Sequence, residues 1–166
     1  MTHGLSHWLP LHGLGSAATD DISLRSGMGA CASFAINYRD PDAVLALQKH
    51  LDRYLPVRHL FAADYYPLTD WSEDPQQWLA FQFHDPETGT GIVQAFCGPN
   101  QAEESRKLNL QGLDPDRVYE LVDWDNDGRQ TTITGRELTE PGIVVEAGDD
   151  AAGTAIVLTY RLQKNQ

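Results

Sequence analysis

Apolar residues recur at helical spacing in one stretch of the chain, residues 40–56. The carboxylate of Asp40 can accept hydrogen bonds from the free amides of a first helical turn, and Pro41 suits the first helical position. Pro56 is expected to end the helix, since proline has no amide hydrogen to donate. The stripe that predicts this helix consists of Val44, Leu47, Leu51 and Tyr54, widened by Leu45 and Leu55.

A different pattern precedes the helix. Residues 4–9 can form a short strand, and residues 12–21, rich in Gly, Ser and Asp, predict a loop. Residues 23–30 are expected to form a tight turn or a single helical turn, and the apolar run 31–38 predicts a buried strand. The order strand, loop, strand, helix is typical of an α/β barrel rather than of a free-standing β-domain.

After Pro56 the pattern changes to short strands separated by turns rich in Gly, Pro and Asp. In residues 154–162, for example, Ile156, Leu158 and Tyr160 alternate with other residues, which places one apolar face toward a core. Regular short strands with such turns predict an antiparallel β-sandwich. The predicted strands lie near residues 58–68, 76–84, 90–97, 105–111, 117–123, 129–134, 142–147 and 154–162.

Composition and charge limit the kinds of molecule that this chain can bind. The chain has 166 residues, fewer than the roughly 200 that a complete (β/α)₈ barrel needs. Its hydrophobic content of 41% and charged content of 22% are typical of a folded globular protein. The formal net charge of −12 repels nucleic-acid phosphates and anionic lipid. We therefore expect neither a nucleic acid nor a membrane among its partners.

Sequence motifs point to no cofactor. Cys31 and Cys97 both lie in apolar, strand-like runs, which fits buried thiols in a reducing compartment, and no Cys/His spacing matches a zinc site. The chain has no nucleophile elbow, Walker loop or dinucleotide-binding fingerprint. No signal peptide and no apolar run of about 20 residues is visible. We therefore expect a cytoplasmic protein.

Four stretches of the second half carry a family resemblance: RHLFAADYYPLT (58–69), WLAFQFHDPETGTGIVQAF (78–96), LNLQGLDPDRVYELVDWD (108–125) and TGREL (134–138). Their order resembles the C-terminal β-domain of bacterial, melibiase-like α-galactosidases of glycoside hydrolase family 36. LSHWLPLHG (5–13) and RSGMGACASFAINYRDPD (25–42) resemble the last turns of the barrel in the same enzymes. These are turn and core motifs, so they indicate fold and kinship before activity.

The resemblance implies a mainly β fold in two parts. Residues 1–57 are expected to be a remnant of the C-terminal end of a (β/α)₈ catalytic barrel, that is, its last βα elements. Residues 58–166 are expected to form the C-terminal antiparallel β-sandwich domain. The boundary is predicted between Pro56 and Asp64.

The resemblance also implies a chemistry that this chain would not complete. Family members are retaining glycosidases, in which two carboxylates about 5 Å apart act as nucleophile and as acid–base. Both are aspartates on earlier barrel strands, upstream of the residues present here. The acidic residues of this chain fall mostly in loops, turns or a helix start, where solvated carboxylates are expected: Asp20, Asp21, Asp40, Asp42, Glu103, Glu104, Asp149 and Asp150.

Three residues of the barrel-like part are candidate contacts to a sugar, because late barrel strands deliver side chains to the mouth of the barrel. Trp8 can stack on a sugar face or belong to the core. His12, in a Gly-rich loop, can donate to a hydroxyl. Arg25 can hold a carboxylate or a sugar oxygen, or form a structural ion pair.

One motif resembles a calcium loop. Asp123, Asp125, Asp127 and Gly128 have the spacing of an EF-hand opening, but Thr134 stands where a bidentate Glu belongs. The flanking residues have strand character, so we interpret the motif as a hairpin turn.

Two functions remain open at this point. The first is the C-terminal fragment of a retaining hydrolase that acts on terminal α-galactosides, with the missing upstream barrel as its partner and an inactive chain in isolation. A homo-oligomer is compatible with this resemblance. The second is a stand-alone, non-catalytic β-sandwich that binds carbohydrate or a partner protein, unless its aromatics pack in the core. The aromatic platforms would be Trp71, Trp124, Tyr65 or Tyr66.

Overall fold

The computed structural model describes residues 13, 15–99, 101, 103–125, 129–148 and 153–163. The chain divides into two compact units, Met1–Ala63 and Asp64–Gln166, which are treated one at a time. The predicted strand at residues 4–9 lies outside the described residues.

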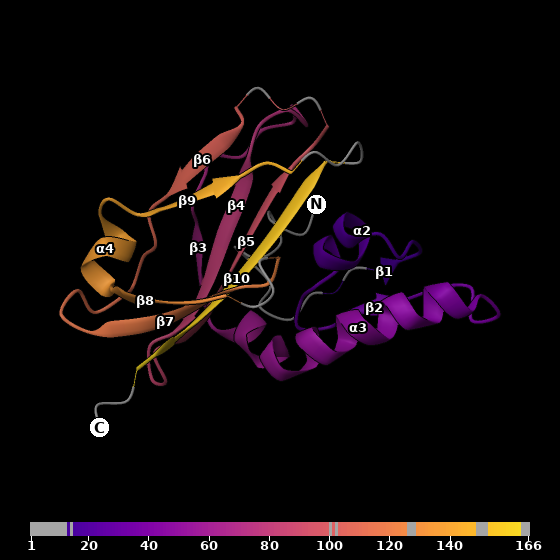
Figure 1. Ribbon diagram of the computed structural model, residues 1–166, viewed down its shortest axis with the longest axis horizontal. Coiled ribbons are helices and arrows are strands. Elements are labelled where there is room, and N and C mark those ends of the chain that lie inside the picture. Colours follow the sequence, from indigo (N-terminus) through magenta and orange to yellow (C-terminus); the bar gives the residue numbers. More distant parts are fainter. Residues whose placement is uncertain are drawn as a thin grey trace. The chain divides into compact units, whose positions relative to one another are not determined.

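The first unit combines short strands with helices (Figure 1). Strands β1 and β2 pair in parallel, with Gly15 opposite Ser33 and Ser16 opposite Phe34. A small core forms around Leu24, Ile36 and Leu47. The elements in chain order are β1 (Gly15–Ser16), α2 (Asp21–Ser26), β2 (Ser33–Phe34), α3 (Pro41–Val57) and the 3-10 helix η1 (Arg58–Ala62).

The predicted long helix is confirmed as α3. The Asp40 carboxylate accepts hydrogen bonds from the amides of Asp42 and Ala43, and Pro41 is the first helical residue. Pro56 lies inside the last turn, one residue before the end at Val57, so it limits the helix less sharply than the sequence suggests.

Two predictions for the first unit are wrong in detail. The run 31–38 forms a strand only at Ser33–Phe34, the two residues that pair with β1. It is also not fully buried, since Cys31, Ser33 and Ala35 are exposed. The predicted loop 12–21 contains β1, whose Ser16 carbonyl accepts from the Ala35 amide. At residues 23–30 the helical alternative is correct, since α2 reaches Ser26.

The second unit is an antiparallel β structure, as predicted. A six-stranded sheet has the order β3-β4-β5-β10-β7-β8, and β6 pairs with β9 in a separate ribbon (Figure 1). All of these pairs are antiparallel. The strands are β3 (Asp64–Pro67), β4 (Leu79–Asp85), β5 (Thr90–Cys97), β6 (Ser105–Leu108), β7 (Val118–Asp123), β8 (Gln130–Thr134), β9 (Ile143–Glu146) and β10 (Thr154–Leu162).

The β4–β5 hairpin shows how local sequence fixes strand pairing. The Asp85 carboxylate accepts from the amides of Glu87 and Thr88, and from the Thr88 hydroxyl at 2.7 Å. Gly89 has a φ of 65°, a left-handed conformation that suits glycine, and its amide donates to the Asp85 carbonyl. This turn sets the register that places Asp85 opposite Thr90.

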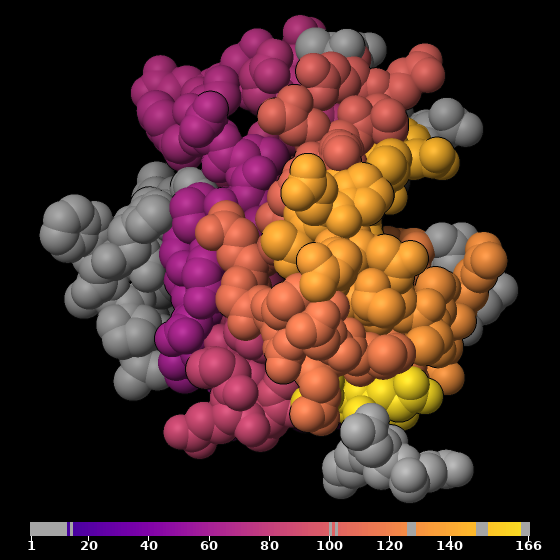
Figure 2. Space-filling model, turned by 90° about the vertical axis from the view of Figure 1, so that its left-hand side faces the viewer, coloured from indigo at the N-terminus to yellow at the C-terminus, as the bar shows by residue number. Residues whose placement is uncertain are grey.

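The core of the second unit lies between the six-stranded sheet and a second layer formed by the β6–β9 ribbon and a short helix. In Figure 2 the orange residues of β9 and of this helix lie together on the face turned to the viewer. Two packed layers with alternating buried residues make this unit a β-sandwich. The buried core residues are Trp78, Ala80, Val93, Ala95, Cys97, Leu108, Leu110, Tyr119, Leu138, Ile143, Val145, Leu158 and Tyr160.

The short helix α4 (Gly135–Thr139) was not predicted. Thr134 caps it, because its hydroxyl accepts from the Glu137 amide while the Glu137 carboxylate accepts from the Thr134 amide. This reciprocal capping box has a sequence signature, Thr-x-x-Glu, that was available in residues 134–137. Leu138 of α4 is fully buried, so the helix anchors the second layer.

The start of the second unit also differs from prediction. The sequence predicts a strand over residues 58–68, but Arg58–Ala62 form η1 and only Asp64–Pro67 pair with β4. The other predicted strands agree with the structure within a few residues at each end.

Candidate functional site

The structure describes one of the three predicted sugar contacts, Arg25; Trp8 and His12 lie outside the described residues. Arg25 lies in α2, which Asp20 caps by accepting from the Ser23 amide at 2.8 Å. The Arg25 side chain is buried, and its Nη2 lies 3.2 Å from Oδ2 of Asp21, one turn earlier. The guanidinium is therefore held within the first unit by a carboxylate of its own helix.

A buried histidine that the sequence analysis missed lies in α3. His50 stacks on Tyr54 with ring centroids 5.9 Å apart and meets the edge of Phe34 at 5.6 Å. Its Nε2 has no hydrogen-bond partner in the described part of the chain. Burial, and secondarily the charge of Arg25, lowers the pKa of His50 to about 4. At neutral pH the ring is uncharged and keeps one unused polar atom.

A signal for His50 was present in the helical pattern. Position 50 falls on the same helix face as Leu47 and Tyr54, which lie three residues before it and four residues after it. A polar residue on an apolar stripe marks a buried polar group that needs an explanation.

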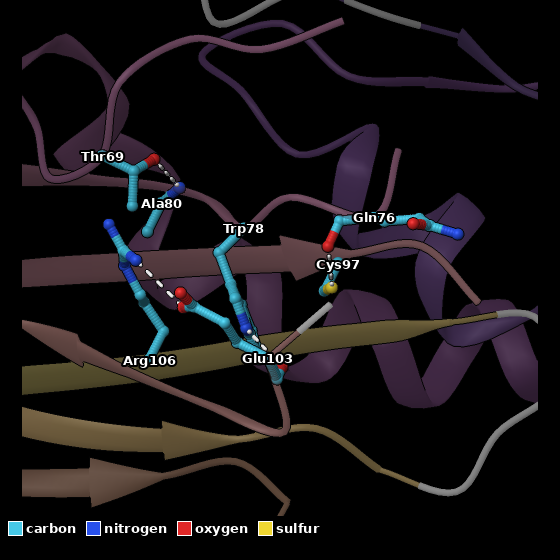
Figure 3. Close-up of polar contacts among 7 residues, drawn as sticks. All are labelled: Thr69, Gln76, Trp78, Ala80, Cys97, Glu103 and Arg106. Carbon is cyan, nitrogen blue, oxygen red and sulfur yellow. Dashed lines mark hydrogen bonds and ion pairs between the residues drawn. The ribbon is translucent and has the colours of Figure 1, made fainter. Parts of the chain in front are cut away.

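The second region is the connection between β3 and β4, residues 68–78, which we call the Trp71 loop. Two hydrogen bonds of 2.9 Å fix its start. The Leu68 amide donates to the Ala80 carbonyl. The Ala80 amide donates to Oγ1 of Thr69 (Figure 3). At its end the Gly98 amide donates to the Pro75 carbonyl at 2.8 Å. Both ends are thus attached to the sheet.

Side chains near the end of the Trp71 loop add to this attachment. The Cys97 thiol donates to the Gln76 carbonyl, and the Trp78 indole donates to the Glu103 carbonyl at 3.1 Å (Figure 3). Glu103 also pairs with Arg106 at 3.0 Å. Burial raises the pKa of the Cys97 thiol, which keeps it protonated as a donor.

The aromatic platforms proposed from the sequence separate into two groups. Trp71 is 62% exposed, whereas Trp124 is 8% exposed and contributes to the core. Tyr65 is partly buried and contacts the rings of Phe81 and Phe83. Tyr66 is also partly buried. Of the four candidates, Trp71 is therefore the one with a mainly exposed ring.

The third region is a buried polar network on the core face of the sheet. Gln82 and His84 of β4 and Tyr160 of β10 are all buried there. The Gln82 amide nitrogen donates to the Tyr160 hydroxyl at 2.7 Å, and the hydroxyl lies 3.0 Å from Nδ1 of His84. Burial lowers the pKa of His84. The hydrogen bonds give every member a local partner, as buried polar groups require.

Three described carboxyl groups have a lowered pKa and are therefore not general acids of the raised-pKa type. The pKa values of Asp20, Asp85 and Glu137 are lowered, chiefly because each carboxylate accepts a hydrogen bond from the side chain of Ser23, Thr88 or Thr134. A retaining glycosidase needs one carboxyl group with a raised pKa beside a carboxylate. These three groups therefore serve as turn and helix caps.

The calcium-like motif behaves as a hairpin turn in its described part. The Asp125 amide donates to Oδ1 of Asp123 at 2.9 Å, and the Asp123 amide donates to the Arg129 carbonyl. The flanking strands β7 and β8 pair antiparallel, as the hairpin interpretation predicts. Asp127 and Gly128 lie outside the described residues, and the described residues contain no cluster of metal-ligating side chains.

None of the helices in the described part of the chain is long and apolar enough to span a membrane.

Comparison with known proteins gives a family match within the second unit. Residues 78–158 match the family model "Glycosyl hydrolase family 36 C-terminal domain". No curated protein matches the sequence.

Solved structures share the fold. The α-galactosidase from Lactobacillus brevis is 15% identical, with a TM-score of 0.74 over 93% of this chain and 23% of that chain. The family 36 α-galactosidase AgaA from Geobacillus stearothermophilus, as a variant in complex with raffinose, is 15% identical, with a TM-score of 0.69 over 91% of this chain and 21% of that chain. This chain thus spans less than a quarter of the enzymes it resembles in fold.

Proposed function

We propose that this chain is the C-terminal portion of a retaining hydrolase of terminal α-galactosides, because residues 78–158 match the model of the glycosyl hydrolase family 36 C-terminal domain. The family match carries the proposal. The similar α-galactosidase structures support it, because their likeness extends over 93% and 91% of this chain. Residues 1–57 then correspond to the last βα elements of a (β/α)₈ barrel.

The chemistry of such a hydrolase divides between two carboxylates. One attacks the anomeric carbon, and the other protonates the departing oxygen and then activates water. We place both in the part of the enzyme that this chain does not cover. The downward pKa shifts of Asp20, Asp85 and Glu137 fit that placement, because each of these groups is already committed to a cap.

In this proposal the first unit contributes one edge of the sugar site, and the second unit supports the barrel. Trp8, His12 and Arg25 stay the proposed contacts to substrate. The ion pair of Arg25 with Asp21 favours the structural alternative for that residue, since a guanidinium paired within its own helix has fewer donors left for a sugar.

The isolated chain is therefore expected to be inactive. Incubation of the purified chain with a nitrophenyl α-galactoside should release no more nitrophenol than a buffer blank, with an intact α-galactosidase as the positive control. Release at rates typical of enzymes would overturn the proposal. The reading frame on the 5′ side of the Met1 codon provides an independent check: it should encode a barrel with two aspartates at strand ends.

A second function is favoured by one observation, the exposure of Trp71 on a loop that is fixed at both ends. Ordered loops with exposed aromatic rings are suited to binding, because stacking costs little conformational entropy there. In this alternative the β-sandwich binds carbohydrate through Trp71 without hydrolysing it.

Titration with galactose, melibiose and raffinose, followed by tryptophan fluorescence, tests this alternative. Binding should change the emission of the original chain and not that of the Trp71→Ala variant. Tyr38→Ala, which removes another exposed aromatic ring, is the matched control and should keep the response. A flat titration of the original chain would rule the alternative out for these sugars.

A further inference from the structure

The Gln82 side chain acts as a pairing partner for the backbone between β6 and β7. Its Oε1 accepts from the Gln111 amide at 2.8 Å, and its Nε2 donates to the Gln111 carbonyl at 2.9 Å. These two bonds fix which end of the amide is oxygen, since Gln111 offers one donor and one acceptor. They attach residues 109–113, which we call the Gln111 segment, to β4.

The remaining Gln82 hydrogen determines the direction of the next bond. Nε2 has a second hydrogen, which it donates to the Tyr160 hydroxyl oxygen at 2.7 Å. The hydroxyl must then donate its own hydrogen to another acceptor, and Nδ1 of His84 lies 3.0 Å away. Nδ1 can accept it only as an unprotonated nitrogen, so the ring is neutral and carries its hydrogen on Nε2.

We propose that Gln82, Tyr160 and His84 form an acid-sensitive latch that holds the Gln111 segment to the sheet. When His84 gains a proton on Nδ1, the contact between this nitrogen and the Tyr160 hydroxyl contains two hydrogens, one from each group. The Tyr160 hydroxyl loses its acceptor, and a charge appears in the core. The network relieves this conflict by opening, which releases the Gln111 segment. The latch is independent of the proposed hydrolase.

The groups around His84 oppose one another. Burial has the largest influence and lowers the pKa of His84. Hydrogen bonds to the backbone of Thr90 and Gly112 and the charges of Asp64 and Asp85 favour the protonated ring but are outweighed. Tyr160 stacks on the ring at 5.8 Å, and Tyr119 of β7 meets Tyr160 at 5.9 Å. Burial raises the pKa of the Tyr160 hydroxyl, which therefore stays a donor.

Two glycines leave space for this arrangement. A Cβ at Gly91 would overlap the Tyr160 hydroxyl and lie 2.6 Å from the Phe83 carbonyl oxygen. Gly112 has a φ of 74°, and a Cβ there would lie 2.8 Å from the Tyr66 hydroxyl and 3.1 Å from Cδ2 of His84. The backbone thus approaches the network too closely for any side chain, which leaves a protonated ring little room to rearrange.

The sign of the pH dependence follows from the lowered pKa. The unfolded or opened chain binds the His84 proton near the ordinary value of 6.5, whereas the closed network binds it only at lower pH. The stability that the neutral ring gives to the closed state is therefore fully present above about pH 6.5. It falls over the window between about pH 6.5 and the lowered pKa of the closed state, and it levels off below that pKa. Within that window the protection of the Gln111 amide should fall by about tenfold per pH unit.

Nuclear magnetic resonance on the full ¹⁵N-labelled chain tests the latch. Long-range imidazole spectra should show His84 in the Nε2–H form at neutral pH, with a pKa below 6.5. Hydrogen exchange, corrected for the intrinsic pH dependence, should show the fall in Gln111 protection. An Nδ1–H ring, or a pKa at or above 6.5, would overturn the proposal.

Three variants separate the latch from a general acid effect. His84→Asn keeps an acceptor near the position of Nδ1 but does not titrate, so it should abolish the acid-induced loss of Gln111 protection. His59→Asn, at an exposed histidine of η1, should leave that loss unchanged. Tyr160→Phe removes the donor that favours the neutral ring, so the pKa of His84 should rise. If His84→Asn fails to fold, Tyr160→Phe decides: an unchanged or lower pKa of His84 contradicts the latch.

Discussion

The two units each bury a histidine, but they satisfy it differently. In the second unit Nδ1 of His84 lies 3.0 Å from the Tyr160 hydroxyl, which also accepts from Gln82. In the first unit His50 packs between aromatic rings, and its Nε2 has no partner among the described residues. An unpaired buried polar atom costs about 1–3 kcal/mol, whereas a paired one is close to neutral. Among the described residues, the second unit therefore satisfies the polar atoms of its buried histidine, and the first unit leaves one without a partner.

The largest loss of stability is expected when the Gln82 network of the second unit is opened. Gln82→Ala leaves the Gln111 amide and carbonyl without their partner and creates a cavity, so the free energy of unfolding should fall by about 3 kcal/mol or more. Urea denaturation measures the loss. Gln77→Ala, at an exposed glutamine, is the control and should change little. A loss below about 1 kcal/mol for Gln82→Ala would contradict the role given to this side chain.

A smaller loss is expected from crowding the same network. Gly91→Ala places a methyl group against the Tyr160 hydroxyl and should cost about 1–3 kcal/mol, because the surrounding strands must shift. Gly148→Ala is a matched control, since the nearest atom to its added Cβ is Oγ1 of Thr154 at 3.8 Å. Thermal unfolding of both variants compares them directly. Equal melting temperatures would show that the network adapts more easily than its geometry indicates.

His50 should make the stability of the first unit decrease in acid. The pKa of His50 is lowered to about 4 from an ordinary value of 6.5, so the unfolded chain binds the proton first as pH falls. Stability contributed by His50 is present above 6.5 and is lost progressively down to about 4. Denaturation at a series of pH values, with His50→Leu as the comparison, measures this.

For His50→Leu itself we expect a change within about 1 kcal/mol at neutral pH, because the substitution removes an unpaired nitrogen and keeps a similar volume. The variant should also lose its part of the pH dependence. A loss of more than about 2 kcal/mol at neutral pH would show that the ring makes a polar contact essential to the fold.

The smallest effect is expected at the surface of the second unit. Trp71→Ala removes an exposed ring whose loop is fixed by Thr69, Pro75 and Gln76 rather than by the indole. Its free energy of unfolding should change by no more than about 0.5 kcal/mol. Urea denaturation checks this, and a larger loss would mean that the indole packs against the loop.

Local sequence was enough where a residue and its neighbours decide the structure. The Asp40 cap and Pro41 predicted α3, and the turn at Asp85 to Gly89 predicted the β4–β5 hairpin. The capping box at Thr134 and Glu137 carried the same kind of information for α4, although the prediction missed it. The prediction of a buried strand over residues 31–38 was wrong, because apolar composition alone does not show that alternate residues are exposed.

The sequence by itself determined the alternation of strands and turns after Pro56, the helix at residues 41–57 and the family resemblance, because each depends on spacing along the chain. Only the tertiary structure decided that Gln82, His84 and Tyr160 meet in one network, since strands β4 and β10 lie on either side of β5. The same holds for the exposure of Trp71 and the burial of Trp124. Burial and long-range pairing arise when distant segments exclude water together, and no local pattern contains that information.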